Sequence, residues 1–178
     1  KGEVMALIGE SGSGKSVTLR ALMRLHPPGS SELSGTLQVG DNEVLTMSAS
    51  QLRRYRGGRC AMIFQEPLLA FDPVYTVGQQ IIEGLRRHEG LSRQAARDRA
   101  LEALSQVRIP SPERRLDAYP HEMSGGMRQR AMIALALSCN PQLLLADEPT
   151  TALDATVQIQ ILILLREQQK QRGLSIVY

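Results

Sequence analysis

The stretch Gly9-Glu10-Ser11-Gly12-Ser13-Gly14-Lys15-Ser16 decides the fold of this 178-residue chain. An apolar run at residues 4–8 precedes it and ends at Gly9, which predicts a short buried strand. A helical pattern follows from residue 15 to about residue 25 and stops at Pro27-Pro28-Gly29. A strand, a glycine-rich loop and a helix in this order predict a cradle of backbone N–H groups, which is typical of phosphate binding.

The loop fits the pattern GxxxxGK(S/T), and the chemistry of phosphate binding explains each residue type. Glycines let the backbone approach phosphate oxygens without a Cβ in the way, and the helix N-terminus adds a partial positive charge. We expect Lys15 to reach the β- and γ-phosphates of ATP and the Ser16 hydroxyl to ligate Mg²⁺. A flexible turn before a helix is the weaker alternative. The expected nucleotide-binding residues of the loop are Gly9, Glu10, Ser11, Gly12, Ser13, Gly14, Lys15, Ser16 and Val17.

Other segments predict the rest of a sheet. Residues 60–64 and 143–147 are typical of buried strands, and residues 175–178 begin a further one. Residues 36–39 alternate before a Gly40-Asp41-Asn42 turn, which predicts a β-hairpin. The pattern is helical from about residue 74 to residue 139, with Ser92 as an expected N-cap. Buried strands that alternate with helices predict an α/β fold whose parallel sheet is covered on both faces.

Two carboxylates, Asp147 and Glu148, end the apolar run at residues 143–146. Asp147, at the carboxyl end of the expected strand, is placed to hold the hydration shell of Mg²⁺. Glu148 is the candidate base that would polarise the attacking water. Alone, such a pair is often a strand running into a solvated loop, but a phosphate loop in the same chain favours the catalytic interpretation.

A second candidate anion site lies at Ser124-Gly125-Gly126, ahead of an apolar helical run at residues 131–137. Ser124 is the expected N-cap, and the two glycines leave the first helical N–H groups bare. One nucleotide needs one phosphate cradle, so a second is explained if it grips the γ-phosphate of ATP held by another subunit. A capped helix behind a Gly-Gly hinge would be favoured if this motif stood alone.

With Phe64-Gln65-Glu66-Pro67 and Ala152-Leu153-Asp154 added, the chain resembles the ATPase cassette of ATP-binding-cassette (ABC) transporters over essentially its whole length. Met123-Ser124-Gly125-Gly126-Met127 resembles the family signature LSGGQ, with methionine in place of Leu and Gln. Residues 61–67, 119–126 and 146–154 resemble the ATP-binding subunits of oligopeptide, dipeptide, glutathione and nickel importers. ABC exporters usually carry a different segment ahead of the signature.

The resemblance implies an α/β P-loop NTPase (RecA-like) parallel-sheet core, a small antiparallel β subdomain and an inserted α-helical subdomain. Residues 1–71 and 141–178 would form the nucleotide-binding core with the β subdomain, and residues 72–140 the helical subdomain with the signature. The family's site residues then map onto this chain as follows: Glu148, Gln65 and Asp154 serve catalysis, Ser16, Gln65 and Asp147 hold Mg²⁺, and Ser124, Gly125 and Gly126 contact the nucleotide.

The resemblance also implies an ATPase that powers import of peptides or a related small solute. Its partners would be a second ABC ATPase subunit and transmembrane permease subunits, on the cytoplasmic face of the membrane. Val17 stands where many family members have Thr, so we expect the hydroxyl contact to the α-phosphate either to be absent or to come from Thr18. We expect one domain truncated at both ends, because the family's adenine-stacking aromatic lies upstream of Lys1 and its switch histidine beyond Tyr178.

Composition limits the alternatives. The net charge is only +3 and aromatic residues make up 3% of the chain, so we expect no nucleic-acid partner. The basic cluster at residues 53–56 is expected to be a solvated face. Cys60 and Cys139 lie in apolar runs and are expected to be buried free thiols in a reducing compartment. No apolar run approaches the ~20 residues that a membrane span needs.

Two other functions remain open at this point. A soluble ABC-type ATPase acting on nucleic acid, in DNA repair or with ribosomes, would usually carry zinc-binding CxxC insertions, coiled-coil arms or tandem cassettes, none of which is present in this sequence. A P-loop kinase of a small metabolite would leave Ser124-Gly125-Gly126 unexplained.

Overall fold

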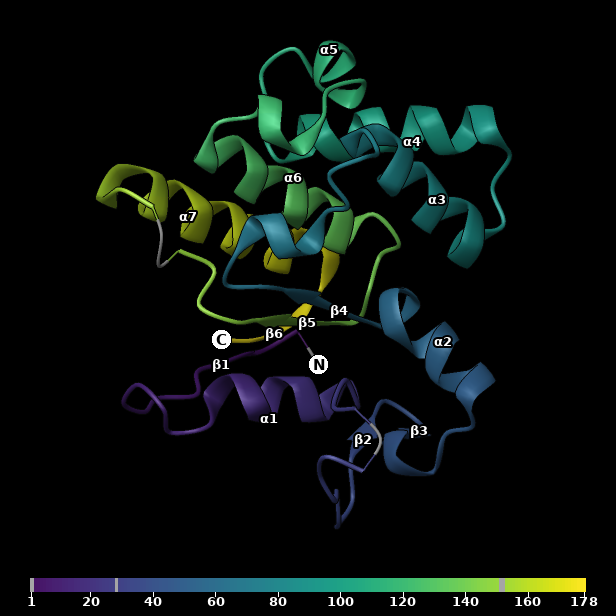
Figure 1. Ribbon diagram of the computed structural model, residues 1–178, viewed down its shortest axis with the longest axis vertical. Helices are drawn as coiled ribbons and strands as arrows, with labels where there is room; N and C mark the ends of the chain where they lie inside the picture. Colours follow the sequence, from purple (N-terminus) through teal and green to yellow (C-terminus); the bar gives the residue numbers. More distant parts are fainter. Residues whose placement is uncertain (1, 28, 151–152) are drawn as a thin grey trace.

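The central sheet consists of four parallel strands in the order β1-β6-β5-β4 (Figure 1). This computed structural model describes residues 2–27, 29–150 and 153–178. Parallel pairing requires a crossover between neighbouring strands, and helices supply these connections. The strands are β1 (Val4–Met5), β4 (Cys60–Ile63), β5 (Leu143–Ala146) and β6 (Ser175–Val177).

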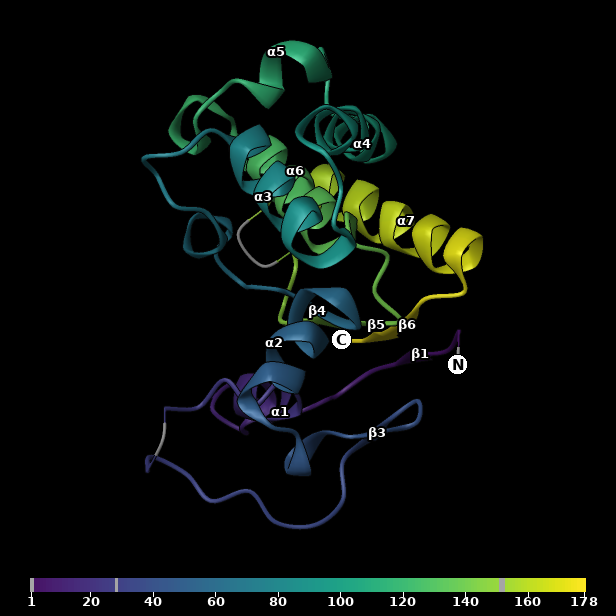
Figure 2. The same cartoon turned by 90° about the vertical axis from the view of Figure 1, so that its right-hand side faces the viewer.

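Helices cover the sheet on two sides, as the two views in Figures 1 and 2 show. On one side lie α1 (Lys15–Leu22) and the hairpin of β2 (Gln38–Val39) and β3 (Asn42–Glu43), with α2 (Ala49–Gly58) beside them. The other side carries α3 (Val77–Glu89), α4 (Arg93–Gln106), α5 (Pro112–Leu116), α6 (Gly125–Leu137) and α7 (Ala155–Arg172). The part of the chain that the structure describes also has the short 3₁₀ helices η1 (Val44–Thr46), η2 (Pro67–Ala70) and η3 (Pro120–Glu122).

Strands β4 and β5 divide their side chains between two hydrophobic clusters. Ala61 and Ile63 of β4 pack with the α3, α4, α6 and α7 side, whereas Cys60 and Met62 pack with Leu19 of α1 and with α2. Successive strand residues point to opposite faces, so a strand covered on both faces must be apolar throughout. This arrangement confirms the α/β fold with a parallel core and a small antiparallel hairpin.

The expected strand at residues 4–8 is wrong in length and in burial. The paired residues of β1 are Val4 and Met5, although the Leu7 N–H still donates to the Tyr178 carbonyl at 2.7 Å. The residues Val4 and Met5 are 53% and 61% exposed, and Ile8 is 96% exposed. The reason is position: β1 lies at the edge of the sheet and pairs with one neighbour within the described residues. The hairpin is confirmed but shorter than expected, because Val44 and Leu45 enter η1.

The basic cluster at residues 53–56 is not a solvated face throughout. Tyr55 is buried against α1 and β4, and its hydroxyl donates to the Leu22 carbonyl. Arg56 Nε donates to the Met23 carbonyl, so this arginine ties α2 to the end of α1. A helical pattern in residues 49–58 is weak because the segment buries only Tyr55.

Both cysteines are free and buried, as expected. Burial raises the pKa of the Cys60 thiol to about 12, and it also raises the pKa of Cys139. A thiol is nucleophilic only when deprotonated, so these side chains are structural apolar groups at neutral pH.

Gly78 of α3 offers a direct test of how the helices pack. A Cβ at this position would lie 2.4 Å from Leu116 Cγ and 2.5 Å from the Leu116 carbonyl oxygen. We expect Gly78→Ala to lower the free energy of unfolding by about 1–3 kcal/mol, because backbone must move to make room. Gly84→Ala on the same helix meets nothing within 4 Å and should gain up to about 1 kcal/mol from helix propensity. Urea unfolding of the two variants measures the difference, and equal midpoints would contradict the α3–α5 packing.

Candidate nucleotide-binding and catalytic site

The phosphate loop closes around its own lysine. Lys15 Nζ donates to the Gly9 carbonyl at 2.8 Å and to the Glu10 carbonyl at 2.9 Å. Gly14 caps α1 with a φ of 92°, and Gly12 has a φ of 81°, a region that favours glycine. The loop therefore turns through two left-handed positions and delivers Lys15 to the start of a helix.

The loop fits a phosphate chain. A Cβ placed at Gly12 or Gly14 would meet nothing within 4 Å, so the outside of the loop is open at both positions. The N-cap of α1 is a glycine with no side-chain hydrogen bond, which leaves the first helical N–H groups without a side-chain acceptor. An ammonium group has three donors, and two of those of Lys15 are used within the loop. Open N–H groups, a helix N-terminus and a cation form an anion site.

Ser16 and Asp147 meet from opposite ends of the chain. Ser16 Oγ donates to Asp147 Oδ1 at 2.7 Å, and the Asp147 side chain lies at the carboxyl end of β5 with 3% of the residue exposed. The Asp147 backbone N–H donates to the Ile63 carbonyl at 2.9 Å, which extends the β4–β5 pairing and fixes the carboxylate. A hydroxyl and a carboxylate oxygen are hard donors of the kind that Mg²⁺ prefers, so this pair fits the ion.

Glu148 lies between the loop and the end of β4. Its Oε2 accepts a hydrogen bond from Gln65 Nε2 at 3.2 Å, and its Oε1 lies 3.8 Å from Lys15 Nζ. The φ of Glu148 is 46°, a left-handed conformation uncommon for a residue with a Cβ. The backbone reverses direction after Asp147, so the two neighbouring carboxylates point to different groups. Asp147 contacts Ser16, and Glu148 faces Lys15 and Gln65.

The Ser124-Gly125-Gly126 segment lies elsewhere. Ser124 Oγ accepts a hydrogen bond from the Met127 N–H at 3.4 Å, which confirms the expected N-cap of α6. Helix α6 is on the opposite side of the sheet from α1, so the two helix starts do not form one site in this chain (Figures 1 and 2). Asp154 caps α7 by accepting from the Val157 N–H at 3.0 Å, and Thr151 and Ala152 before it lie outside the described residues.

Gln129 is a site neighbour that the sequence interpretation missed. It lies on α6, is 2% exposed, and its Nε2 donates at 2.5 Å to the carbonyl of Pro149, the residue after Glu148. The sequence does contain a hint of this contact. Gln129 lies one helical turn after Gly125-Gly126, at the border of a wholly apolar helical run, and a polar side chain that is buried there needs a hydrogen-bond partner.

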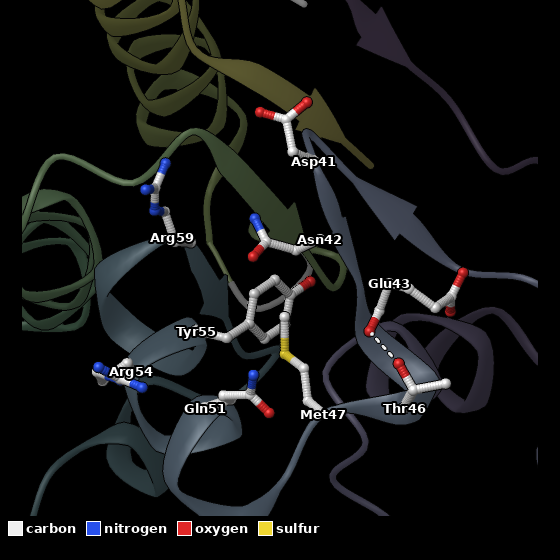
Figure 3. Close-up of a pocket in the computed structure, with 9 residues that line it drawn as sticks. All are labelled: Asp41, Asn42, Glu43, Thr46, Met47, Gln51, Arg54, Tyr55 and Arg59. Carbon is white, nitrogen blue, oxygen red and sulfur yellow. Dashed lines mark hydrogen bonds between the residues drawn. The ribbon is translucent and has the colours of Figure 1, made fainter.

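A surface pocket, shown in Figure 3, lies apart from the predicted site residues. It has a volume of about 490 Å³ and lies between the β2–β3 hairpin and α2, with the Tyr55 ring on its wall (Figure 3). Asp41 and Glu43 line it together with Arg54 and Arg59, and none of the predicted site residues does. A hollow of mixed charge does not resemble a phosphate cradle.

Fold and site together define the class of protein. Ser16, Lys15, Gln65, Asp147 and Glu148 come from three segments that are distant in sequence, and they meet at the carboxyl ends of parallel strands in an α/β fold. This arrangement is that of a P-loop NTPase. The chain belongs to the ABC transporter family, whose match covers residues 1–151.

Named relatives agree with this family. The dipeptide transport ATP-binding protein DppD of Haemophilus influenzae is 51% identical over an alignment of 179 positions. The alignment covers 99% of this chain and 54% of that protein. The peptidoglycan transport ATP-binding protein YejF of Agrobacterium fabrum is 52% identical over 178 residues, 99% of this chain and 33% of that protein. The chain thus spans about half the length of most curated relatives that it matches.

A solved structure shares the fold over nearly the whole chain. It is the dimeric ATP-binding cassette MJ0796 in a post-hydrolysis state bound to ADP and Pi, with a TM-score of 0.84 and 30% identity. The alignment covers 99% of this chain and 73% of that one. The resemblance to the ABC ATPase family is therefore confirmed.

Among the helices that the structure describes, none has the length and apolar character needed to span a membrane.

Proposed function

We propose that this chain is the ATP-hydrolysing portion of a subunit of an ABC importer. The importer as a whole transports peptides or a related small solute. The observation that carries the proposal is the cluster at the ends of β4 and β5: Lys15 in its loop, Ser16 on Asp147, and Gln65 on Glu148. The peptide and dipeptide transport names of its relatives support the solute class.

ATP would lie along the loop of residues 9–17, with its phosphates against the N–H groups of α1 and Lys15. Ser16 and Asp147 would hold Mg²⁺, with Gln65 beside them, and the bound ion supplies positive charge that neutralises phosphate oxygens. The hydrogen bond between Ser16 and Asp147 keeps both oxygens together before any ligand arrives. This preorganisation favours binding because the protein loses little further freedom.

Glu148 is the proposed general base. Its carboxylate can accept the proton of a water that attacks the γ-phosphate, and the Gln65 amide fixes the orientation of that carboxylate through Oε2. Lys15 lies at 3.8 Å from the other oxygen, so the same cation faces both the base and the expected phosphates. A fixed base beside a fixed phosphate lowers the entropic cost of the attack.

Ser124, Gly125 and Gly126 would act on the ATP of a second cassette, because they begin α6, which lies on the opposite side of the sheet from α1 (Figure 1). Within the proposed helical subdomain of residues 72–140, they present a helix N-terminus to the partner. Asp154 would lie at the same dimer interface. Transmembrane permease subunits would bind near Gln65, and the protein would be peripheral on the cytoplasmic face of the membrane.

Ser124→Arg tests the shared site. We expect hydrolysis to fall at least about 100-fold, since the arginine fills the position of the partner's γ-phosphate, while ATP affinity of the monomer stays unchanged. Ser92→Arg is the matched control, because Ser92 caps α4 through the Ala95 N–H in the same way. Nucleotide titration and phosphate release measure both effects in the full-length protein. Equal loss of monomer affinity in Ser124→Arg would show that Ser124 contacts the nucleotide of its own chain.

A further inference from the structure

We propose that Gln129 is a positioning residue for Glu148, and that it links the start of α6 mechanically to the base of the same chain. The inference rests on the proposed function, since it gives a role to a residue outside the groups that touch ATP. It joins two sites that the fold otherwise separates: the helix start offered to a partner's nucleotide, and the base that serves this chain's own.

The contact is short and buried. Gln129 Nε2 donates to the Pro149 carbonyl at 2.5 Å, and Gln129 is 2% exposed. Pro149 is itself buried and has no N–H, so its carbonyl is the only backbone polar group that this residue offers. A buried carbonyl that loses its donor is left unsatisfied, which is costly.

The position of Pro149 bears on the backbone conformation of Glu148, the residue before it. Glu148 has a φ of 46°, whereas a residue that precedes proline ordinarily adopts an extended conformation. A non-glycine residue persists in a sparsely populated conformation when its surroundings hold it there. Among the described contacts, the Asp147 N–H donates to the Ile63 carbonyl on one side of Glu148, and Gln129 donates to the Pro149 carbonyl on the other side.

The other end of the link is the signature segment. Gln129 lies one helical turn beyond Gly125 and Gly126 on α6, so a displacement of the helix start moves both together. A Cβ at Gly126 would lie 3.2 Å from Val157 Cγ1, which shows that the first turn of α6 packs closely against the first turn of α7. When a partner's phosphate fixes Ser124-Gly125-Gly126, Gln129 therefore holds Pro149, and with it Glu148, in place.

Gln129→Met is the first test, in the full-length protein. Methionine fills a similar volume without a donor, so we expect kcat for ATP hydrolysis to fall about 10- to 100-fold with the KM for ATP unchanged. Gln168→Met is the matched control, because Gln168 is also buried, at 4% exposure, and accepts a hydrogen bond from Arg172 Nε on α7. That variant should lose stability and keep its kcat per folded molecule.

Gln129→Glu is the second test and separates positioning from stability. Burial beside a carbonyl raises the pKa of the new carboxyl, so at alkaline pH a carboxylate repels the Pro149 oxygen, and at acidic pH a neutral carboxyl donates to it. We expect the ratio of the variant's kcat to that of wild type to rise as the pH falls. With kcat expressed per folded molecule, a role in stability alone predicts no such recovery.

The outcomes are distinct. A kcat of Gln129→Met equal to that of Gln168→Met, or a pH-independent ratio for Gln129→Glu, overturns the positioning role while leaving the ATPase assignment intact. A wild-type protein that binds Mg·ATP without hydrolysing it contradicts the proposed function instead. Loss of kcat in Gln129→Met together with acid recovery in Gln129→Glu supports the link.

Discussion

Glu148→Gln is expected to slow ATP hydrolysis by about 10²- to 10⁴-fold while ATP still binds. The amide cannot accept a proton from the attacking water, yet it keeps the size of the side chain and can still hydrogen-bond to Gln65. Lys15, Ser16 and Asp147 are untouched, so the phosphate and Mg²⁺ contacts remain. The variant should therefore accumulate a dimer that holds unhydrolysed ATP between its subunits.

Single-turnover phosphate release measures the rate, and size-exclusion chromatography with ATP measures the dimer. Glu102→Gln is the control, since Glu102 is exposed on α4, where it pairs with Arg99 and accepts a hydrogen bond from Gln106 Nε2 at the surface. It should hydrolyse ATP at the wild-type rate. If Glu148→Gln retains near-normal turnover, the base is another group.

Lys15→Ala is expected to weaken ATP binding at least about 100-fold, because each charge-assisted hydrogen bond is worth about 1.5–3 kcal/mol. Two effects add. The phosphates lose the cation at the start of α1, and the Gly9 and Glu10 carbonyls lose the donor that closes the loop. The Ser16–Asp147 hydrogen bond remains, but the turn at Gly9 and Glu10 loses the side-chain contacts that fix its shape around the ligand.

Equilibrium titration with a fluorescent ATP analogue measures this loss. Lys170→Ala is the matched control, because Lys170 lies exposed in the last turn of α7. Its affinity should equal that of wild type. An unchanged affinity in Lys15→Ala would remove the phosphate-loop assignment altogether.

The sheet could be predicted from sequence only where strands are covered on both faces. Strands β4 and β5 are apolar throughout because each packs against two clusters, and this leaves a signal in the sequence. The run at residues 4–8 is equally apolar in sequence, but Val4, Met5 and Ile8 are exposed. Hydropathy alone does not show which strand lies at the edge of a sheet. Helix α2 buries one residue, Tyr55, so its periodicity could not be distinguished from a solvated cluster.

Two contacts of the candidate site bring together residues that were singled out in separate motifs. The Ser16–Asp147 hydrogen bond joins residues 131 positions apart, and each was expected at Mg²⁺ from its own motif. Gln65 and Glu148 were both expected to serve catalysis from the resemblance to the family, and their side chains are hydrogen-bonded. The left-handed backbone of Glu148 and the Gln129–Pro149 link could not be predicted, because both depend on how α6 packs against the end of β5.

The proposed nucleotide site is tested most directly by a structure of the full-length protein bound to Mg²⁺ and a non-hydrolysable ATP analogue. We expect the phosphates to lie against residues 9–17, Mg²⁺ to lie at Ser16 and Asp147, and Ser124 of a second copy to contact the γ-phosphate. Nucleotide bound away from this loop, or contacted by Ser124 and Lys15 of one and the same chain, would contradict the proposed site.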